Sequence, residues 1–240
     1  MSEKESRYLI VGPGRTGSSL LSAILVNIGA SFDLPVLENW ESRAGAYEHP
    51  LIHSARRWQL RMLKIDDSLI PNGIGESLCA KRMQHDLREV LERACYVKSS
   101  DLVWLVHPIY KLGYWPRIIV SYRDFMGYAR SRYLKYGFAM HQLVQMYVEV
   151  YSTALLELHT FGGCVIDYAD MLTERETGWA NALSQISGIS MQSILDERGK
   201  IVDHEPRPAL PLYDFLACQD DLTRIQDSFE ALKGVVVEPK

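Results

Sequence analysis

The chain has 240 residues, of which 47% are hydrophobic and 23% charged, with a formal net charge of −4 at pH 7. This length and composition predict one globular domain over residues 1–240, and the slightly acidic balance argues against nucleic acid or an anionic membrane as a partner. No apolar run approaches the roughly 20 residues of a transmembrane segment, and the charged start MSEKESR is not typical of a secretory signal. The four cysteines are far apart in apolar contexts, which favours reduced core residues and a cytoplasmic location.

The apolar pattern predicts strands that alternate with helices. The expected strands are 8–11, 95–100, 117–122 and 163–168. The expected helices are 18–28, 51–69, 81–93, one from about 125, 141–159, one after a Thr173–Glu176 capping box and one near the C-terminus. Short apolar strands separated by long helices indicate crossover connections, so we expect an α/β fold of three layers, a mostly parallel sheet flanked by helices. Ligands bind such sheets at the carboxyl ends of the strands.

The segment after the first expected strand has the pattern of an anion-binding loop. It reads YLIVGPGRTGSSLL from Tyr8, a buried strand, a glycine-rich turn and the start of an apolar helix. Gly12 and Gly17 have the spacing of the nucleoside-triphosphatase loop, but Ser18 stands where that loop has its lysine. The candidate anion-binding residues here are Gly12, Gly14, Arg15, Thr16, Gly17, Ser18 and Ser19.

Two cations follow later strands. Lys98 ends the second expected strand, where a lysine is unusual, although it could simply reach solvent. Arg123 follows the third expected strand, and a surface pair with Asp124 is the ordinary alternative. Ser131 lies eight residues after Arg123, on the expected helix. If the strands are parallel, these groups meet the first loop at one edge of the sheet.

Taken together, these segments resemble the sulfotransferases that use 3′-phosphoadenosine 5′-phosphosulfate (PAPS), above all their bacterial and carbohydrate-directed branches. The resemblance covers about residues 8–190 and rests on GPGRTGSS, GAYEHPLI, YRDFMGYARS and CVIDYAD. It implies the P-loop NTPase-like sulfotransferase fold and a first loop that binds the 5′-phosphosulfate. It also implies that Arg123 and Ser131 hold the 3′-phosphate. The donor has one phosphate before the transferred group. Binding it should therefore require neither the lysine of the nucleoside-triphosphatase loop nor a metal.

The same resemblance assigns the chemistry. In-line transfer to a hydroxyl of a carbohydrate or small molecule would spread charge that Arg15 and Lys98 stabilise. Many members carry a histidine base two residues after the strand-ending lysine, but this chain has Ser100 there. The general base is therefore sought elsewhere: Glu48, which matches a glutamate of the family, is the first candidate, and Glu38 and Asp101 are the alternatives.

Two other functions fit parts of the pattern. An ATP-dependent small-molecule kinase would use a degenerate first loop and Asp167 as a magnesium-binding residue after the last strand, and the missing lysine counts against it. A non-catalytic nucleotide-binding module would keep the fold alone. The presence of Arg15, Lys98, Arg123 and Ser131 argues against it. His49 and His53 are four residues apart, but Pro50 and the lack of a third ligand make a metal site improbable, so none is expected.

Overall fold

A five-stranded, mostly parallel sheet forms the centre of the molecule. The computed structural model describes residues 4–32, 48–63, 74–173, 176–201 and 219–239. The strands are β1 (Ser6–Val11), β2 (Tyr96–Lys98), β3 (Trp115–Tyr122), β4 (Gly163–Asp167) and β5 (Val236–Val237). They lie in the order β2-β1-β3-β4-β5, with β1 to β4 parallel and β5 antiparallel to β4. The prediction of an α/β fold with a mostly parallel sheet is confirmed.

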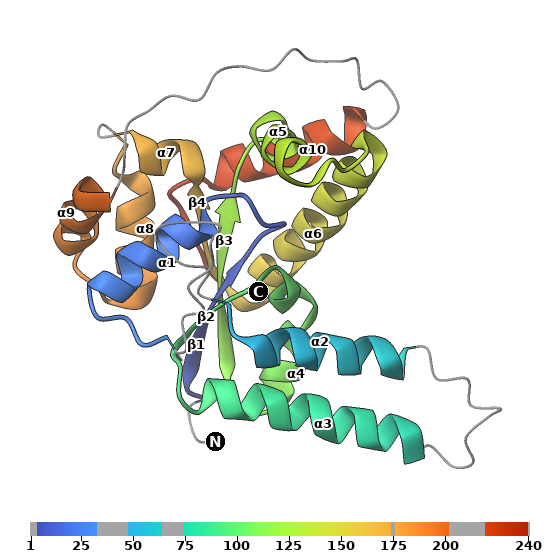
Figure 1. Ribbon diagram of the computed structural model, residues 1–240. Helices are drawn as coiled ribbons and strands as arrows, with labels where there is room; N and C mark the ends of the chain where they lie inside the picture. The colour runs from blue at the N-terminus through green and yellow to red at the C-terminus, as the bar shows by residue number, and fades with distance from the viewer. Residues whose placement is uncertain (1–3, 33–47, 64–73, 174–175, 202–218, 240) are drawn as a thin grey trace.

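Helices cover both faces of this sheet (Figure 1). On one side lie α1 (Ser18–Asn27), α7 (Tyr168–Leu172), α8 (Gly178–Ser187) and α9 (Met191–Ile201). On the other lie α2 (Pro50–Met62), α3 (Ile74–Leu91), the 3-10 helix η2 (Ser100–Trp104), α4 (Val106–Lys111), α5 (Phe125–Tyr136), α6 (Met140–Phe161) and α10 (Gln219–Leu232). None of the described helices combines the length and apolarity of a membrane span.

The alternation of side chains along the strands explains why both faces need cover. In β1, Leu9 and Val11 join the core beneath α6, whereas Ile10 joins the core beneath α1 and α8. All three side chains are buried. Central parallel strands that are apolar on both faces require helices on both faces, which gives the three layers.

Several predicted boundaries moved. The expected helix 51–69 ends at Met62, and the expected helix 81–93 begins earlier, at Ile74. The capping-box prediction is wrong, because Thr173 ends α7 and its hydroxyl donates to the carbonyl of Ala169. The next helix, α8, begins at Gly178.

Candidate anion-binding and catalytic site

The loop from Gly12 to Gly17 joins β1 to α1 through left-handed backbone conformations. Gly14, Arg15 and Gly17 have φ angles of 72°, 63° and 89°, in the left-handed region that non-glycine residues rarely adopt. Gly17 is also the N-cap of α1. A side chain at Gly17 would place its Cβ 2.3 Å from Cδ2 of Tyr168, so the loop requires glycine there. A non-glycine residue such as Arg15 in this region is typical of functional loops.

Strand β3 fixes this loop through Ser121. The Ser121 hydroxyl donates to the Thr16 carbonyl at 2.8 Å, and the Thr16 hydroxyl donates to Ser121 Oγ at 3.2 Å. Both residues are fully buried. A Cβ on Gly12 would lie 2.7 Å from the Ser121 carbonyl oxygen, so the loop backbone packs directly on the end of β3. The buried Thr16 side chain therefore holds the loop in place against the end of β3.

One arginine of the loop, Arg15, and two from outside it, Arg123 and Arg132, gather here. Arg15 Nε donates to Ser131 Oγ at 3.1 Å, so the first loop is in direct contact with the middle of α5. Arg123 Nη1 donates to the Arg15 carbonyl at 3.2 Å. Arg132, which sequence reasoning missed, donates to the carbonyl of Pro13. A dense positive charge at the N-terminus of α1 suits an anionic ligand.

The backbone of Arg123 is held by the core stripe of α6. Tyr147 donates its hydroxyl to the Arg123 carbonyl at 3.0 Å, and the Arg123 amide donates to the Tyr151 hydroxyl at 3.1 Å. Tyr151 in turn donates to the Ser121 carbonyl at 3.0 Å. The guanidinium of Arg123 lies over the Tyr168 ring, 4.6 Å from its centroid. Arg123 is therefore positioned at both its backbone and its side chain.

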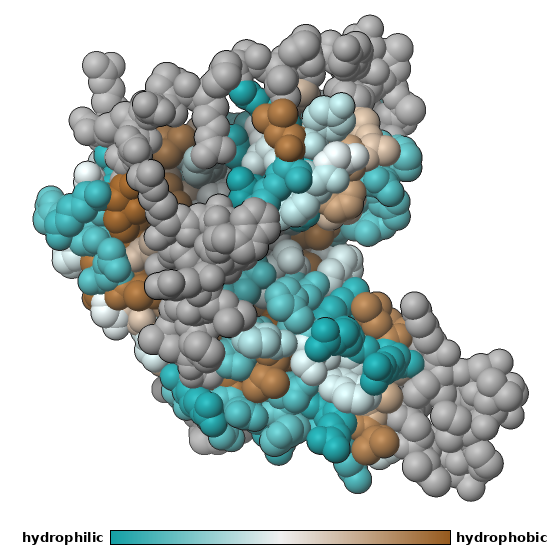
Figure 2. All heavy atoms as spheres, in the orientation of Figure 1, coloured by the Kyte–Doolittle hydropathy of each residue, from teal (hydrophilic) through white to brown (hydrophobic). Residues whose placement is uncertain are grey.

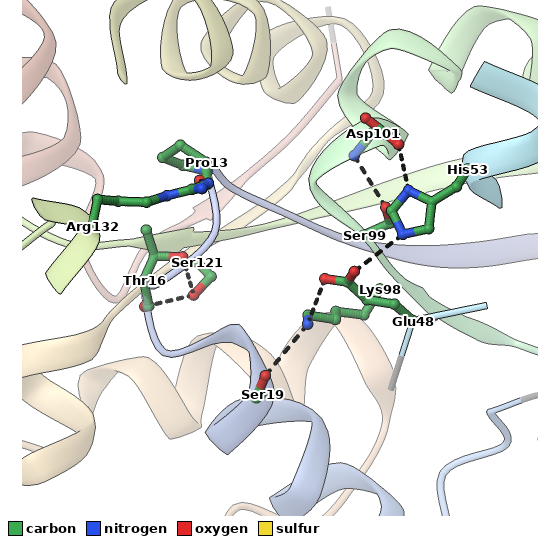
Figure 3. A network of polar contacts seen from close by, with 10 residues as sticks. All are labelled: Pro13, Thr16, Ser19, Glu48, His53, Lys98, Ser99, Asp101, Ser121 and Arg132. Carbon is green, nitrogen blue, oxygen red and sulfur yellow. Dashed lines mark hydrogen bonds and ion pairs between the residues drawn. The ribbon is translucent and has the colours of Figure 1, made fainter. Parts of the chain in front are cut away.

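A second group of charges lies beside the loop (Figure 3). Lys98, at the end of β2, donates to Ser19 Oγ at 3.3 Å and to Glu48 Oε1 at 2.8 Å. The Lys98 side chain is only 7% exposed and that of Glu48 is 29% exposed. Lys98 therefore links the second residue of α1 to the residue that the sequence favours as general base.

The charge network continues through His53, in the first half of α2. His53 Nε2 lies 3.2 Å from Glu48 Oε2, and His53 Nδ1 lies 2.5 Å from Asp101 Oδ2. The Asp101 and Glu48 carboxylates raise the pKa of His53 to about 9, although partial burial opposes them. Burial raises the pKa of Glu48, but the His53 hydrogen bond and the Lys98 charge outweigh it and lower that pKa to about 2.

The structure brings most of the sequence candidates to the carboxyl edge of the sheet. Arg15, Ser131 and Arg123 form one group there, and Lys98, Ser19 and Glu48 form another. Ser18 is buried as the first residue of α1. Glu38 lies outside the described residues.

Sequence reasoning missed His53, because it weighed His53 only as a metal ligand beside His49. His49 instead caps α2, its Nδ1 accepting from the Leu51 amide at 3.1 Å. The signal that could have found His53 is its closeness in sequence to Glu48.

Asp167, the residue that a kinase would use for magnesium, has other partners. Its Oδ1 accepts from the Ala169 amide at 2.9 Å and caps α7. Its Oδ2 pairs with the ammonium of Lys233, which also lies 2.8 Å from Glu230. The Asp167 side chain is 4% exposed. A magnesium ion at Asp167 would therefore have to displace Lys233.

Comparison of the chain with protein-family models and with curated proteins found no match. Among the described residues, no group of three or more His, Cys, Asp or Glu side chains is placed to hold a metal ion.

Proposed function

We propose that the protein is a sulfotransferase with a P-loop NTPase-like fold, which moves the sulfuryl group of PAPS to an acceptor hydroxyl. The observation that carries this proposal is the contact of Arg15 with Ser131, 116 residues apart in the sequence. It joins the two segments that the resemblance assigns to the two ends of the donor. The loop from Gly12 to Gly17 lies with Arg123 and Lys98 at the same edge of a parallel sheet, where ligands of such folds bind.

The charges at this edge suit the reaction. As the S–O bond to the donor breaks, its electron pair leaves with the bridging oxygen of the bisphosphate, and the charge of the sulfuryl group is spread over its equatorial oxygens. Arg15 and Lys98 would stabilise that charge. Glu48 is ionised and pairs with Lys98 in the free protein, where its pKa is about 2. It would accept the proton of the acceptor hydroxyl as the new S–O bond forms, once Lys98 has turned to the donor and lowers that pKa less.

The acceptor class is a second part of the proposal. A carbohydrate or small-molecule hydroxyl is favoured by the resemblance to the carbohydrate-directed branch. The Glu48 side chain is 29% exposed, which leaves room for a hydroxyl to approach its carboxylate. A screen of glycan, phenol and lipid acceptors with labelled donor tests this part.

A thermal unfolding assay tests the donor. Adenosine 3′,5′-bisphosphate should stabilise the protein without added magnesium, by about 2.7 kcal/mol at 100 times its dissociation constant. ATP should stabilise it far less, with or without magnesium. If magnesium and ATP together stabilise the protein and the bisphosphate does not, the kinase alternative replaces this proposal.

A further inference from the structure

His53 lies between two carboxylates, and this placement fixes its protonation. Nδ1 faces Asp101 at 2.5 Å and Nε2 faces Glu48 at 3.2 Å. A neutral imidazole has one donor and one acceptor nitrogen, so one of these contacts would set a lone pair against a carboxylate oxygen. Only the imidazolium donates to both. The geometry therefore requires a charged ring, in agreement with a pKa of about 9 for His53.

The fold fixes the positions of His53 and of its partner Asp101. His53 belongs to a helix whose Ile52 and Ala55 are fully buried, so packing holds its backbone in place. Asp101 lies in the first turn of η2, and its amide donates to the hydroxyl of Ser99 at 3.1 Å. Asp101 thus holds Nδ1 of the ring, and Nε2 is directed at Glu48.

Glu48 has one partner on each oxygen. Oε1 accepts from Lys98 and Oε2 from His53. Under the proposed function, Lys98 turns toward the sulfuryl group when the donor binds, and Glu48 then keeps one cation. Among the described residues, the charged groups that act on His53 or on its partners are Glu48 and Asp101, Lys98, which pairs with Glu48, and Arg56, which interacts with Asp101.

We infer that His53 is a positioning residue: clamped by Asp101, it aims the Glu48 carboxylate at the reaction centre and does not itself take the proton. This inference rests on the proposed function for the reaction that Glu48 serves. The clamp of Asp101, His53 and Glu48 can be tested without it. The role differs from that of a histidine base, because a ring that already carries both protons has no lone pair to offer.

The first test is NMR titration of the protein with ¹⁵N-labelled histidine and no ligand. Both nitrogens of His53 should carry protons at neutral pH, and the ring should lose one only near pH 9. Asp101→Asn and Glu48→Gln should each shift that titration to lower pH, because each removes a carboxylate partner. A wild-type His53 that titrates near 6.5, the ordinary value for histidine, would overturn the inference.

The second test is a double-mutant cycle on the affinity for adenosine 3′,5′-bisphosphate, measured by calorimetry. Glu48→Gln should tighten binding, because the Glu48 carboxylate no longer competes with the anion for Lys98. His53→Gln should weaken binding about three- to tenfold, because Glu48 then draws Lys98 away from the anion. In the Glu48→Gln background, His53→Gln should have little effect. The control is His85→Gln, on the exposed His85 of α3.

The outcomes separate the two proposals. If His53→Gln weakens binding equally in both backgrounds, His53 does not act through Glu48 and the positioning role is wrong. If no variant binds the bisphosphate but the titration behaves as expected, the proposed function fails and the clamp remains. Gln keeps the size of the His53 side chain and one donor group, and the unfolding temperature of each variant shows whether it has folded.

Discussion

At the scale of single residues, two glycines with the same backbone angle predict different costs. Gly17 and Gly29 both have a φ of 89°. A Cβ on Gly29 would have no atom within 4 Å, whereas a Cβ on Gly17 would lie 2.3 Å from the Tyr168 ring. Gly29→Ala should therefore cost only the backbone strain, about 1 kcal/mol of the free energy of unfolding. Gly17→Ala should cost about 2–4 kcal/mol, because the clash adds to the strain.

Urea unfolding of both variants measures this difference. Gly29→Ala is the matched control, since it shares the backbone angle and lacks the neighbour. Gly17→Ala should also weaken binding of adenosine 3′,5′-bisphosphate, because the clash displaces the loop or the Tyr168 ring beneath Arg123. Equal destabilisation of the two variants would show that Tyr168 does not pack on the loop.

Arg123 should matter more for one end of the donor than for the other. Arg123→Ala should weaken adenosine 3′,5′-bisphosphate binding by roughly 1.5–3 kcal/mol, the range for a charge-assisted hydrogen bond. The same variant should weaken the binding of adenosine 5′-phosphosulfate by less, because this ligand lacks the 3′-phosphate. The second loss is not zero, because Arg123 also holds the Arg15 carbonyl. Ser131→Ala should act in the same direction and more mildly.

Calorimetry with the two ligands checks the assignment. Arg82→Ala, at an exposed arginine of α3, is the control for loss of one positive charge. Equal losses for both ligands in Arg123→Ala would place Arg123 away from the 3′-phosphate.

The candidate site could be predicted from the sequence only where local pattern fixes it. The loop 12–19 and Arg123 follow strands, and the end of a parallel strand is a position that hydrophobic pattern alone locates. The network of His53, Glu48 and Asp101 has no such pattern. His53 meets Asp101 across 48 residues of chain, and only the packing of α2 beside η2 brings them together.

At the scale of elements, the C-terminal end of the chain is tied to β4 by an ion pair. Lys233 follows α10 and pairs with the buried Asp167 at the end of β4. Lys233→Met leaves that carboxylate without its cation, so we expect a loss of roughly 2–3 kcal/mol in the free energy of unfolding. The loss is set below that of a fully buried pair because the Lys233 side chain is 23% exposed.

A second substitution tests the cause of that loss. Asp167→Asn in the Lys233→Met background should restore part of the stability, because Asn is uncharged and can still cap α7. Lys200→Met is the control: Lys200 pairs with Glu197 at 2.9 Å but is 71% exposed, so its loss should be much smaller. A failure of Asp167→Asn to restore any stability would assign the loss to packing around Lys233 instead.

Amphipathic stripes were the most predictable feature of the elements. In the expected helix 141–159, positions 143, 147, 151, 154 and 158, spaced three or four residues apart, are buried in α6. Positions 222, 225 and 229 are likewise buried in the expected C-terminal helix, α10. Strand β5 was not predicted, because two residues carry no period and its partner is supplied by the tertiary fold. The Thr173–Glu176 pattern failed for a related reason: the Thr173 hydroxyl found a carbonyl of α7 instead.

At the scale of the whole molecule, the parallel sheet gathers the charges on one edge. On the face drawn in Figure 2, strongly hydrophilic side chains lie over α2, and the outline is notched between the arm of α2 and α3 and the part that carries α5 and α6. The sheet direction was predictable, since crossover helices leave few alternatives. The projection of α2 and α3 from the sheet was not predictable, because the hydrophobic pattern of these helices does not specify where they pack.

The charge network of Asp101, His53 and Glu48 should make the stability of the whole protein depend on pH. The pKa of His53 is about 9 in the folded protein against 6.5 for the free side chain. A raised pKa means that the folded state holds the proton more tightly, so its stabilisation is complete below 6.5 and is lost as the pH rises through 9. The lowered pKa of Glu48 acts in another window: its contribution is complete above 4.5 and is lost as the pH falls toward 2.

Urea unfolding between about pH 6 and about pH 10 isolates the His53 contribution from that of Glu48. Wild type should lose stability over this range, by less than the full pKa shift implies, because the His53 side chain is 39% exposed and solvent screens its ion pairs. His53→Gln should be less stable than wild type at the acidic end, with a flatter dependence on pH. His85→Gln should keep the wild-type slope, since His85 lies on the surface of α3. A His53→Gln variant with the same slope as wild type would mean that some other group titrates in this range and that the clamp of Asp101, His53 and Glu48 does not hold a proton.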